Sequence, residues 1–147
     1  MTAPLLARVI VTAVSAGQGV MPLFIDLNRT HATNLLWTGH ARFHLVQQVF
    51  TLALASGVEV ALLWWPGQAL HARFYLASIL TGTSLAGFLL ASLTRSFYGG
   101  TLHDRNGIRP VRMQIGGRVM MFDMNVPIVT IATVVLIGAV VLFWRGR

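Results

Sequence analysis

The chain has 147 residues, of which 55% are hydrophobic and only 10% are charged, and its mean hydropathy is +0.69. Charged residues make up about 25% of an ordinary soluble domain, so this composition excludes a water-soluble globular protein. The chain has no cysteine, which excludes disulfides and thiolate chemistry. Its net charge of +7 comes from arginines that flank apolar segments, a pattern that favours lipid headgroups over nucleic acid as the partner.

Four apolar segments are long enough to cross a bilayer, which takes roughly 20 residues per helix. They cover residues 5–25, 43–65, 72–94 and 125–144, to within a few positions. The first segment is interpreted as a span and not as a signal peptide, because its apolar part is too long and no small-residue cleavage site follows it. The sequence therefore predicts an all-α integral membrane protein, with residues 1–147 forming a single four-helix transmembrane bundle.

Arginine is more frequent in the first and third loops than on the opposite side of the predicted bundle. The two loops hold Arg29, Arg42, Arg95, Arg105, Arg109, Arg112 and Arg118, and the opposite side holds Arg8, Arg73, Arg145 and Arg147. Because basic residues favour the cytoplasmic side of a membrane, we expect loops one and three to be cytoplasmic.

The first segment and the loop after it carry a directional polar pattern. Thr12, Ser15, Gly19, Pro22 and Asp26 fall on one side of a helix, and we expect that side to face the bundle interior. The loop is dense in Asp, Asn, His, Thr and Trp, which predicts an ordered structure. Thr38 is a plausible N-cap for the second helix.

The second segment places its strongly polar residues on one stripe. At roughly 100° per residue, the stripe collects His40, His44, Gln47, Gln48, Thr51 and Glu59. An ionisable group inside a bilayer costs roughly 2.5–3.5 kcal/mol on insertion scales, so Glu59 requires a reason to be there. A carboxyl hydrogen-bonded to another helix and a proton donor or ligand anchor are both open interpretations.

The third segment has only small and hydroxylated polar residues, namely Ser78, Thr81, Thr83 and Ser84, which predicts a packing role. The third loop contains repeated turn signals and is expected to form a hairpin or a lid over its membrane face. The fourth segment opens with Asn125 and Pro127, and proline suits a first helical turn.

These patterns predict a polar pocket at the membrane face of loops one and three. The candidate catalytic residues are Asp26, His31, His40 and His44, and the candidate ligand-binding residues are Asn28, Asn34, Trp37, Gln47, Gln48, Glu59 and Asn125. In this interpretation Asp26 is the acid or cation stabiliser, His44 is the base or proton shuttle, His31 and His40 support them, and the two glutamines orient the ligand. A carboxyl and an imidazole can move protons without any cofactor. Two histidines at i and i+4 could also share a metal ion with His31 or Asp26 as a third ligand, and this alternative stays open.

The run from Met21 to Gln48 resembles an uncharacterised family of small four-span membrane proteins, through a signature formed by Asn34, Trp37, Thr38, His40, Ala41, Phe43 and His44. More distantly, Pro22-Leu-Phe-x-Asp26-Leu and Asn125-Val-Pro127 are similar to the EXPERA group, which includes the sigma-2 receptor and the emopamil-binding sterol isomerases. That resemblance implies that Asp26, and Glu59 by position, serve an amine- or sterol-binding cavity.

The predicted function is binding of a small apolar, isoprenoid- or sterol-like molecule inside the bundle, with proton-shuffling isomerisation or cyclisation as its extension. The first alternative is a metal-dependent membrane enzyme that uses His31, His40 and His44. The second is a non-catalytic accessory subunit of a larger membrane complex. Membrane lipids are expected partners, nucleic acid is not, and both a homodimer and a larger membrane partner remain open.

Overall fold

A computed structural model describes residues 1–103 and 107–146. The described residues form four long helices: α1 (Ala3–Ile25), α2 (Gly39–Trp64), α3 (Leu70–Thr94) and α4 (Asn125–Arg145). A short 3-10 helix, η1 (Arg95–Tyr98), and two strands, β1 (Val111–Ile115) and β2 (Arg118–Phe122), lie between α3 and α4. Arg105 and Arg147, which contribute to the arginine distribution, lie outside the described residues.

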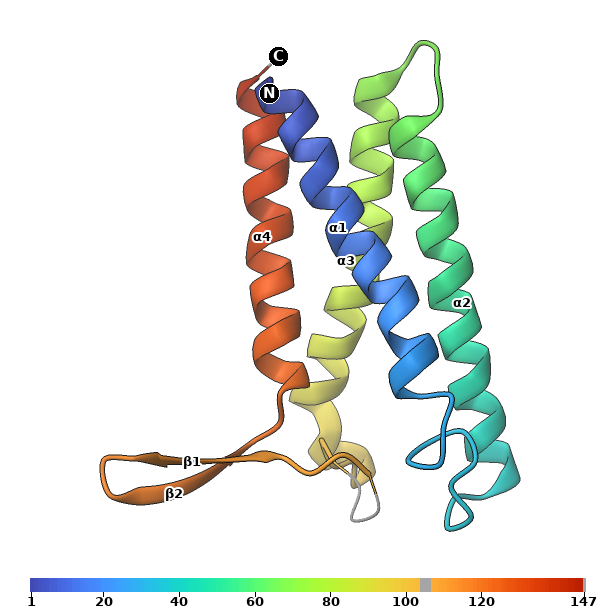
Figure 1. The fold of residues 1–147 in the computed structure, drawn as a ribbon, viewed down its shortest axis with the longest axis vertical. Coiled ribbons are helices and arrows are strands. Elements are labelled where there is room, and N and C mark those ends of the chain that lie inside the picture. The colour runs from blue at the N-terminus through green and yellow to red at the C-terminus, as the bar shows by residue number, and fades with distance from the viewer. Residues whose placement is uncertain (104–106, 147) are drawn as a thin grey trace.

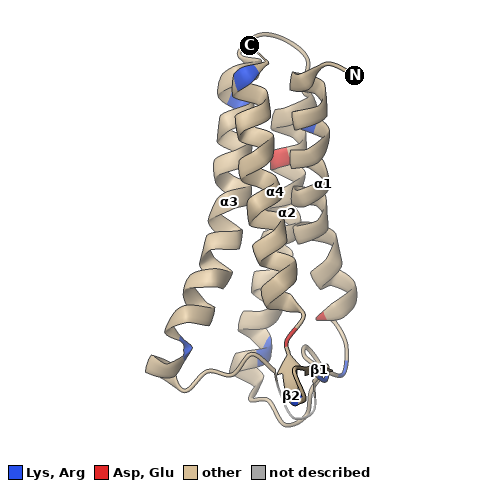
Figure 2. Cartoon of the chain, turned by 90° about the vertical axis from the view of Figure 1, so that its left-hand side faces the viewer, with Lys and Arg blue, Asp and Glu red and all other residues tan. Residues whose placement is uncertain are grey.

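The helices alternate in direction, so both ends of the chain lie at the same end of the bundle (Figure 1). Helix α1 packs against α2 and α4, and α3 closes the ring by packing against the same two helices. All four are long and apolar enough to cross a membrane. The predicted all-α, multi-pass membrane bundle is confirmed, and arginines lie near both ends of the helices (Figure 2). Which loops face the cytoplasm stays a prediction.

The helix boundaries follow from local capping. Helix α2 begins at Gly39 because the Thr38 hydroxyl oxygen accepts a hydrogen bond from the Ala41 N–H at 3.2 Å, which confirms the predicted N-cap. A tight turn joins α2 to α3, and the Arg73 guanidinium donates to the Trp65 carbonyl at 2.6 Å across it. Ala69 in this turn has a left-handed backbone with φ 64°.

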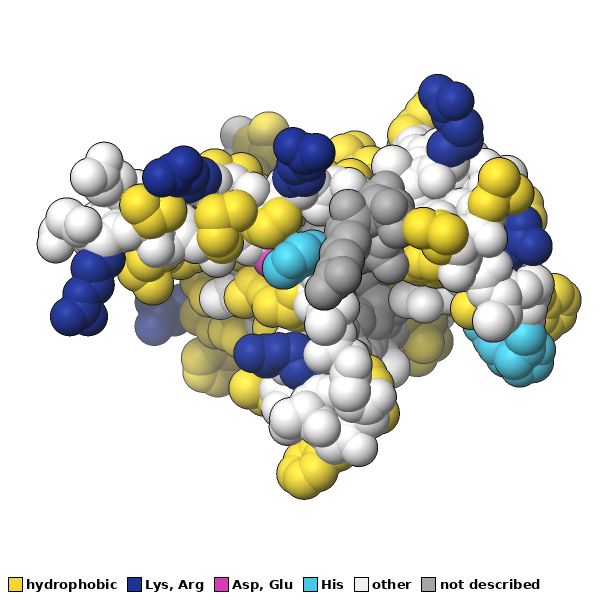
Figure 3. Space-filling model, turned by 90° about the horizontal axis from the view of Figure 1, so that it is seen from below, with side chains coloured by type: hydrophobic (Ala, Val, Ile, Leu, Met, Phe, Trp, Pro, Cys, Tyr) yellow, Lys and Arg dark blue, Asp and Glu magenta, His cyan; other side chains and the backbone are white. Residues whose placement is uncertain are grey.

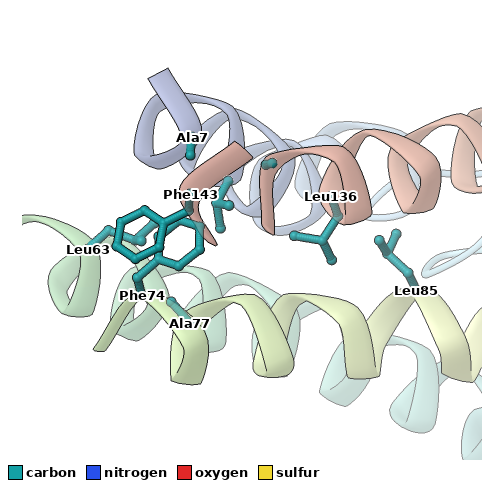
Figure 4. Packing of buried hydrophobic residues seen from close by; sticks show 9 residues of the cluster. Ala7, Leu63, Phe74, Ala77, Leu85, Leu136 and Phe143 are labelled. Atoms are coloured by element: carbon teal, nitrogen blue, oxygen red, sulfur yellow. The ribbon is translucent and has the colours of Figure 1, made fainter. Parts of the chain in front are cut away.

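The hydrophobic core lies toward the end of the bundle that holds the two termini. Phe74 of α3 and Phe143 of α4 stack with ring centroids 3.7 Å apart (Figure 4). Beside them, the Arg8 guanidinium donates to the Leu63 carbonyl at 2.6 Å and lies over the ring of Trp64. These contacts tie α1 to the end of α2.

Burial divides the bundle into two parts. We call residues 3–19, 49–64, 70–85 and 136–145 the terminal half, and residues 20–25, 39–48, 86–94 and 125–135 the loop half. Every helical residue that the structure shows as buried belongs to the terminal half. In the loop half, α3 separates from the other helices (Figure 2). The four helices are therefore closely packed at one end only.

Strands β1 and β2 form an antiparallel hairpin in which Val111 pairs with Phe122 and Ile115 with Arg118. Gly116 and Gly117 make the two-residue turn with φ 58° and 78°, values that suit glycine. The hairpin expected in loop three is thus confirmed. It extends away to the side of the bundle and does not cover the membrane face as a lid (Figure 1).

Candidate functional site

Loop one is ordered by its own side chains. The Asn28 amide donates to the Ile25 carbonyl at 2.7 Å and the Phe24 carbonyl at 3.2 Å, so it satisfies free carbonyls at the end of α1. Asn34 is buried, donates to the Thr30 carbonyl and accepts from the Leu36 N–H. These asparagines, predicted as ligand-binding residues, hold the loop together.

Asp26 and His31 come together at the start of this loop. Asp26 Oδ1 lies 3.8 Å from His31 Nδ1, and both side chains are about three-quarters buried. Burial raises the pKa of the Asp26 carboxyl above its ordinary value of 3.8, and the nearby His31 partly offsets that rise. Asp26 therefore holds its proton to a higher pH than an exposed aspartate does.

The hydrogen bonds around His31 indicate where its proton lies. The side-chain nitrogen of Asn28 donates to the Ile25 carbonyl, so the other side-chain atom, Oδ1, is an acceptor. The Thr30 hydroxyl donates its single proton to this Oδ1 at 2.6 Å. Thr30 Oγ1 is also 2.8 Å from His31 Nδ1, so the imidazole has to donate through Nδ1. In neutral His31, Nε2 is then a free base. The loop thus presents an acid and a base side by side.

His40 and His44 form a second pair, on the first turns of α2. Their Nε2 atoms are 3.0 Å apart, and both side chains are exposed, as are Gln47 and Gln48. Helix α2 buries Val49, Ser56, Glu59 and Leu63, a side centred roughly 100° round the helix from His44. The polar stripe is broad enough for Glu59 to point inward while its other members point outward. Histidine side chains are visible at two separate places on the loop face (Figure 3).

Glu59 occupies a closed polar cluster inside the terminal half. Its side chain is 3% exposed, and Oε2 accepts from the Ser15 hydroxyl at 2.5 Å and the Thr81 hydroxyl at 2.8 Å. Ser56 Oγ lies 3.3 Å from Ser15 Oγ. Hydroxyl groups of α1 and α3 thus provide the hydrogen bonds of the carboxyl. This arrangement corresponds to the first interpretation of Glu59, a carboxyl that is hydrogen-bonded to neighbouring helices. Ser15 was recognisable from its inward side of α1; Thr81 was expected only to pack.

The remaining predicted residues lie near the loop face without joining one pocket. Trp37 is half-buried and packs its ring edge-to-face with His31, with centroids 5.5 Å apart. Asn125 is exposed, and its backbone N–H donates to the Asp123 carboxylate at the start of α4. Of the predicted site, the structure therefore brings Asp26 and Trp37 to His31, which Asn28 reaches through Thr30, and it pairs His40 with His44.

A metal site built from the predicted histidines is not assembled in one chain. Within residues 1–103 and 107–146, no group of three or more His, Cys, Asp or Glu side chains is placed to hold a metal ion. His40 and His44 provide two nitrogens, and His31 contacts Asp26 instead.

Two apolar grooves lie on the outside of the bundle. One, of about 270 Å³, runs between α3 and α4 past Tyr75 and Leu136. The other, of about 500 Å³, runs between α1 and α4 past Val14 and Ile131. Neither is lined by a residue of the predicted polar site.

Residues 8–102 match the model of a family of unknown function, DUF6640. The chain belongs to this family. The DUF6640 match runs from α1 through α3 and includes Asp26, His31, His44 and Glu59, whereas the hairpin and α4 lie beyond it. Membership of an uncharacterised family is thus confirmed. No curated protein and no solved structure matches the chain, and the comparisons show no relation to the EXPERA group.

Proposed function

We propose that this DUF6640 protein binds a small apolar molecule of isoprenoid or sterol type between the helices of the loop half, with the Asp26–His31 pair at its polar end. The observation that carries the proposal is the juxtaposition of two features. Asp26, whose carboxyl pKa is raised by burial, and His31, whose Nε2 is unprotonated in the neutral ring, lie at the loop end of α1. The same half of the bundle holds apolar side chains that the protein covers only partly.

The loop half supplies apolar contact surface. Pro22, Val46, Leu89 and Val126 come from four different helices, and each is half-buried. A ligand or lipid between these side chains would gain the dispersion contacts that the helices do not make with one another. The bilayer itself delivers apolar molecules to such a site.

The paired groups suit proton transfer to and from a hydrocarbon. Asp26, protonated, adds its proton to one carbon of a double bond, and the unprotonated His31 nitrogen removes a proton from a neighbouring carbon. The double bond moves, and the ligand neither gains nor loses atoms. Transfer of the Nδ1 proton of His31 to Asp26, whose Oδ1 lies 3.8 Å away, then restores the acid. The imidazole loses its new Nε2 proton to water and regains one at Nδ1, so the cycle needs no cofactor. His31 takes the role of base that sequence reasoning gave to His44.

Photo-cross-linking tests binding directly. Reconstituted protein would be irradiated with a photoreactive cholesterol analogue and, separately, a photoreactive geranylgeranyl lipid. Leu89→Trp fills the loop half and should reduce labelling severalfold. Leu90→Trp, one residue along and 61% exposed, is the matched control. Equal labelling of both variants would contradict the proposed site.

A second experiment separates the roles of the polar residues. Asp26→Asn and His31→Ala should weaken competition by unlabelled sterol, whereas His44→Ala should not. Incubation with a sterol alkene in heavy water tests catalysis, because a proton-shuffling isomerase places deuterium on the ligand. Binding without deuterium incorporation would reduce the function to binding alone.

A different observation favours the accessory-subunit alternative. His40, His44, Gln47 and Gln48 form an exposed polar stripe on the outer side of α2. Polar side chains in a transmembrane helix commonly bond to a neighbouring helix. A stoichiometric second chain that co-purifies with the protein, but not with the double variant Gln47→Leu/Gln48→Leu, would support that function. Purification of the protein alone, with full labelling by the photoreactive lipid, would exclude it.

A further inference from the structure

We propose that the β1–β2 hairpin lies on the membrane surface, with its apolar face among the acyl chains beneath the headgroups and its arginines on anionic lipid phosphates. This inference is independent of the ligand site. It depends on the strand register, the exposure of the hairpin and its place beside the bundle.

The strand register gives the hairpin two different faces. Directly paired residues of an antiparallel ladder share a face, as do residues two apart along a strand. One face therefore carries Val111, Met113, Ile115, Met120 and Phe122, with Arg118 at its turn end. The opposite face carries Arg112 and Gln114 together with Val119 and Met121. The first face is almost wholly apolar.

The described residues leave this apolar surface uncovered. Met113, Ile115 and Met120 are 45%, 50% and 46% exposed. A two-stranded hairpin is marginally stable in water unless its apolar face packs against something. The bundle does not supply that surface, because the hairpin extends away from it (Figure 1).

The bilayer is the nearest surface of suitable chemistry. Helix α4 begins at Asn125, directly after the hairpin, so β2 ends close to the level at which the chain enters the membrane. The strands run across the direction of the helices, and therefore along the membrane plane (Figure 1). An amphipathic element at this level buries its apolar side in the headgroup and acyl boundary.

The charge of the hairpin matches an anionic lipid surface. Arg109, Arg112 and Arg118 lie on or beside the strands, and residues 107–122 contain no acidic residue. Basic and hydrophobic side chains are interspersed along the hairpin when the loop face is viewed (Figure 3). Basic residues near a membrane are attracted to anionic headgroups. A soluble acidic protein could bind the arginines too, but only a membrane offers anionic groups and an apolar interior side by side.

The natural absence of cysteine makes a site-directed test direct. Single substitutions Met113→Cys and Gln114→Cys place a spin label on the apolar face and on the opposite face of full-length protein in nanodiscs with anionic lipid. Ile131→Cys, on the exposed side of α4, calibrates the hydrocarbon. We expect the label at position 113 to meet oxygen more than a water-soluble nickel chelate, and the label at position 114 to show the reverse. Equal exposure of both labels to the chelate would overturn the proposal and would favour a hairpin that is free or awaits a protein.

A second measurement tests the lipid charge. Arg109→Gln, Arg112→Gln and Arg118→Gln, added singly to Met113→Cys, should each lower the equilibrium constant for placing the hairpin on the membrane about fivefold at low salt, and the triple variant should lower it further. Replacement of the anionic lipid by a zwitterionic one should affect the parent as strongly as the triple substitution does. Insensitivity of the position-113 label to both changes would show that headgroup charge does not hold the hairpin. Helix content and elution volume confirm that each variant is folded.

Discussion

In the terminal half, all four helices bury side chains against one another, whereas in the loop half the same four helices leave theirs half-buried or exposed. Both halves are apolar, so hydrophobicity does not explain the difference. Lipid provides no hydrophobic force between helices, and close packing in a membrane depends on matched shapes and hydrogen bonds. The terminal half has the Phe74–Phe143 stack and the Glu59 cluster, and the loop half has no counterpart among its described residues.

The largest expected effect is the removal of a ring from the packed half. Phe143 is 1% exposed, and Phe143→Ala should reduce the free energy of unfolding by about 2–3 kcal/mol, less than in a soluble core because lipid replaces part of the lost contact. Phe88→Ala in the loop half should cost under about 1 kcal/mol. Unfolding in mixed detergent micelles measures both. Equal losses would remove the contrast between the halves.

The contact between α1 and α2 gives the next effect. A Cβ atom on Gly19 would lie 2.5 Å from Ser56 Cβ, whereas nothing lies within 4 Å of one on Gly17. Gly19→Ala should therefore destabilise the protein by about 2 kcal/mol, and Gly17→Ala should not. Thermal unfolding of the two variants provides the comparison, and a neutral Gly19→Ala would show that the helices are not in close contact there.

Loss of the buried carboxyl should have a smaller effect. Glu59→Leu leaves the Ser15 and Thr81 hydroxyls without their shared acceptor, and hydrogen bonds of this kind within membranes contribute about 0.6 kcal/mol each. We expect a loss of about 1 kcal/mol, and less for Glu59→Gln, whose amide oxygen still accepts. Sterol labelling should be unchanged, because Glu59 belongs to the packed half. Loss of labelling in a folded Glu59→Gln protein would indicate that the ligand binds near Glu59 in the terminal half.

The smallest expected effect concerns pH in the loop half. Because the folded protein raises the pKa of Asp26 above 3.8, folded chains bind this proton more tightly than unfolded chains do. The contribution to stability is fully present below 3.8 and is lost as pH rises through the raised pKa. Asp26→Asn should flatten that part of the stability–pH curve. A steeper curve for the variant would contradict the raised pKa of Asp26.

The sequence was a good predictor of what depends on length and local patterns. Segment hydropathy located all four helices, Thr38 marked the start of α2, and the glycine-rich turn marked the hairpin. Helical periodicity also placed Ser15 and Gly19 inside. These features are local, since each is determined by residues close together in the chain.

The composition of the site was less predictable. The α2 stripe indicated a shared direction for His44 and Glu59, but its breadth allowed the neighbouring helices to enclose one edge and leave the other outside. The contact of Asp26 with His31 depends on how loop one folds back through Asn28 and Thr30. The fold of loop one determines that His31, and not His44, contacts Asp26. Helical periodicity gives no information about a loop.

The turn between α2 and α3 has a consequence for engineering. Ala69 adopts φ 64° there, a left-handed conformation that costs a residue with a Cβ roughly 1 kcal/mol and costs glycine almost nothing. Ala69→Gly would relieve that strain while leaving the carbonyls held by Arg73 in place. The turn at the other end of the bundle from Asp26 and His31 is thus a position where a more stable protein could be obtained without altering a packed helix face or the proposed ligand site.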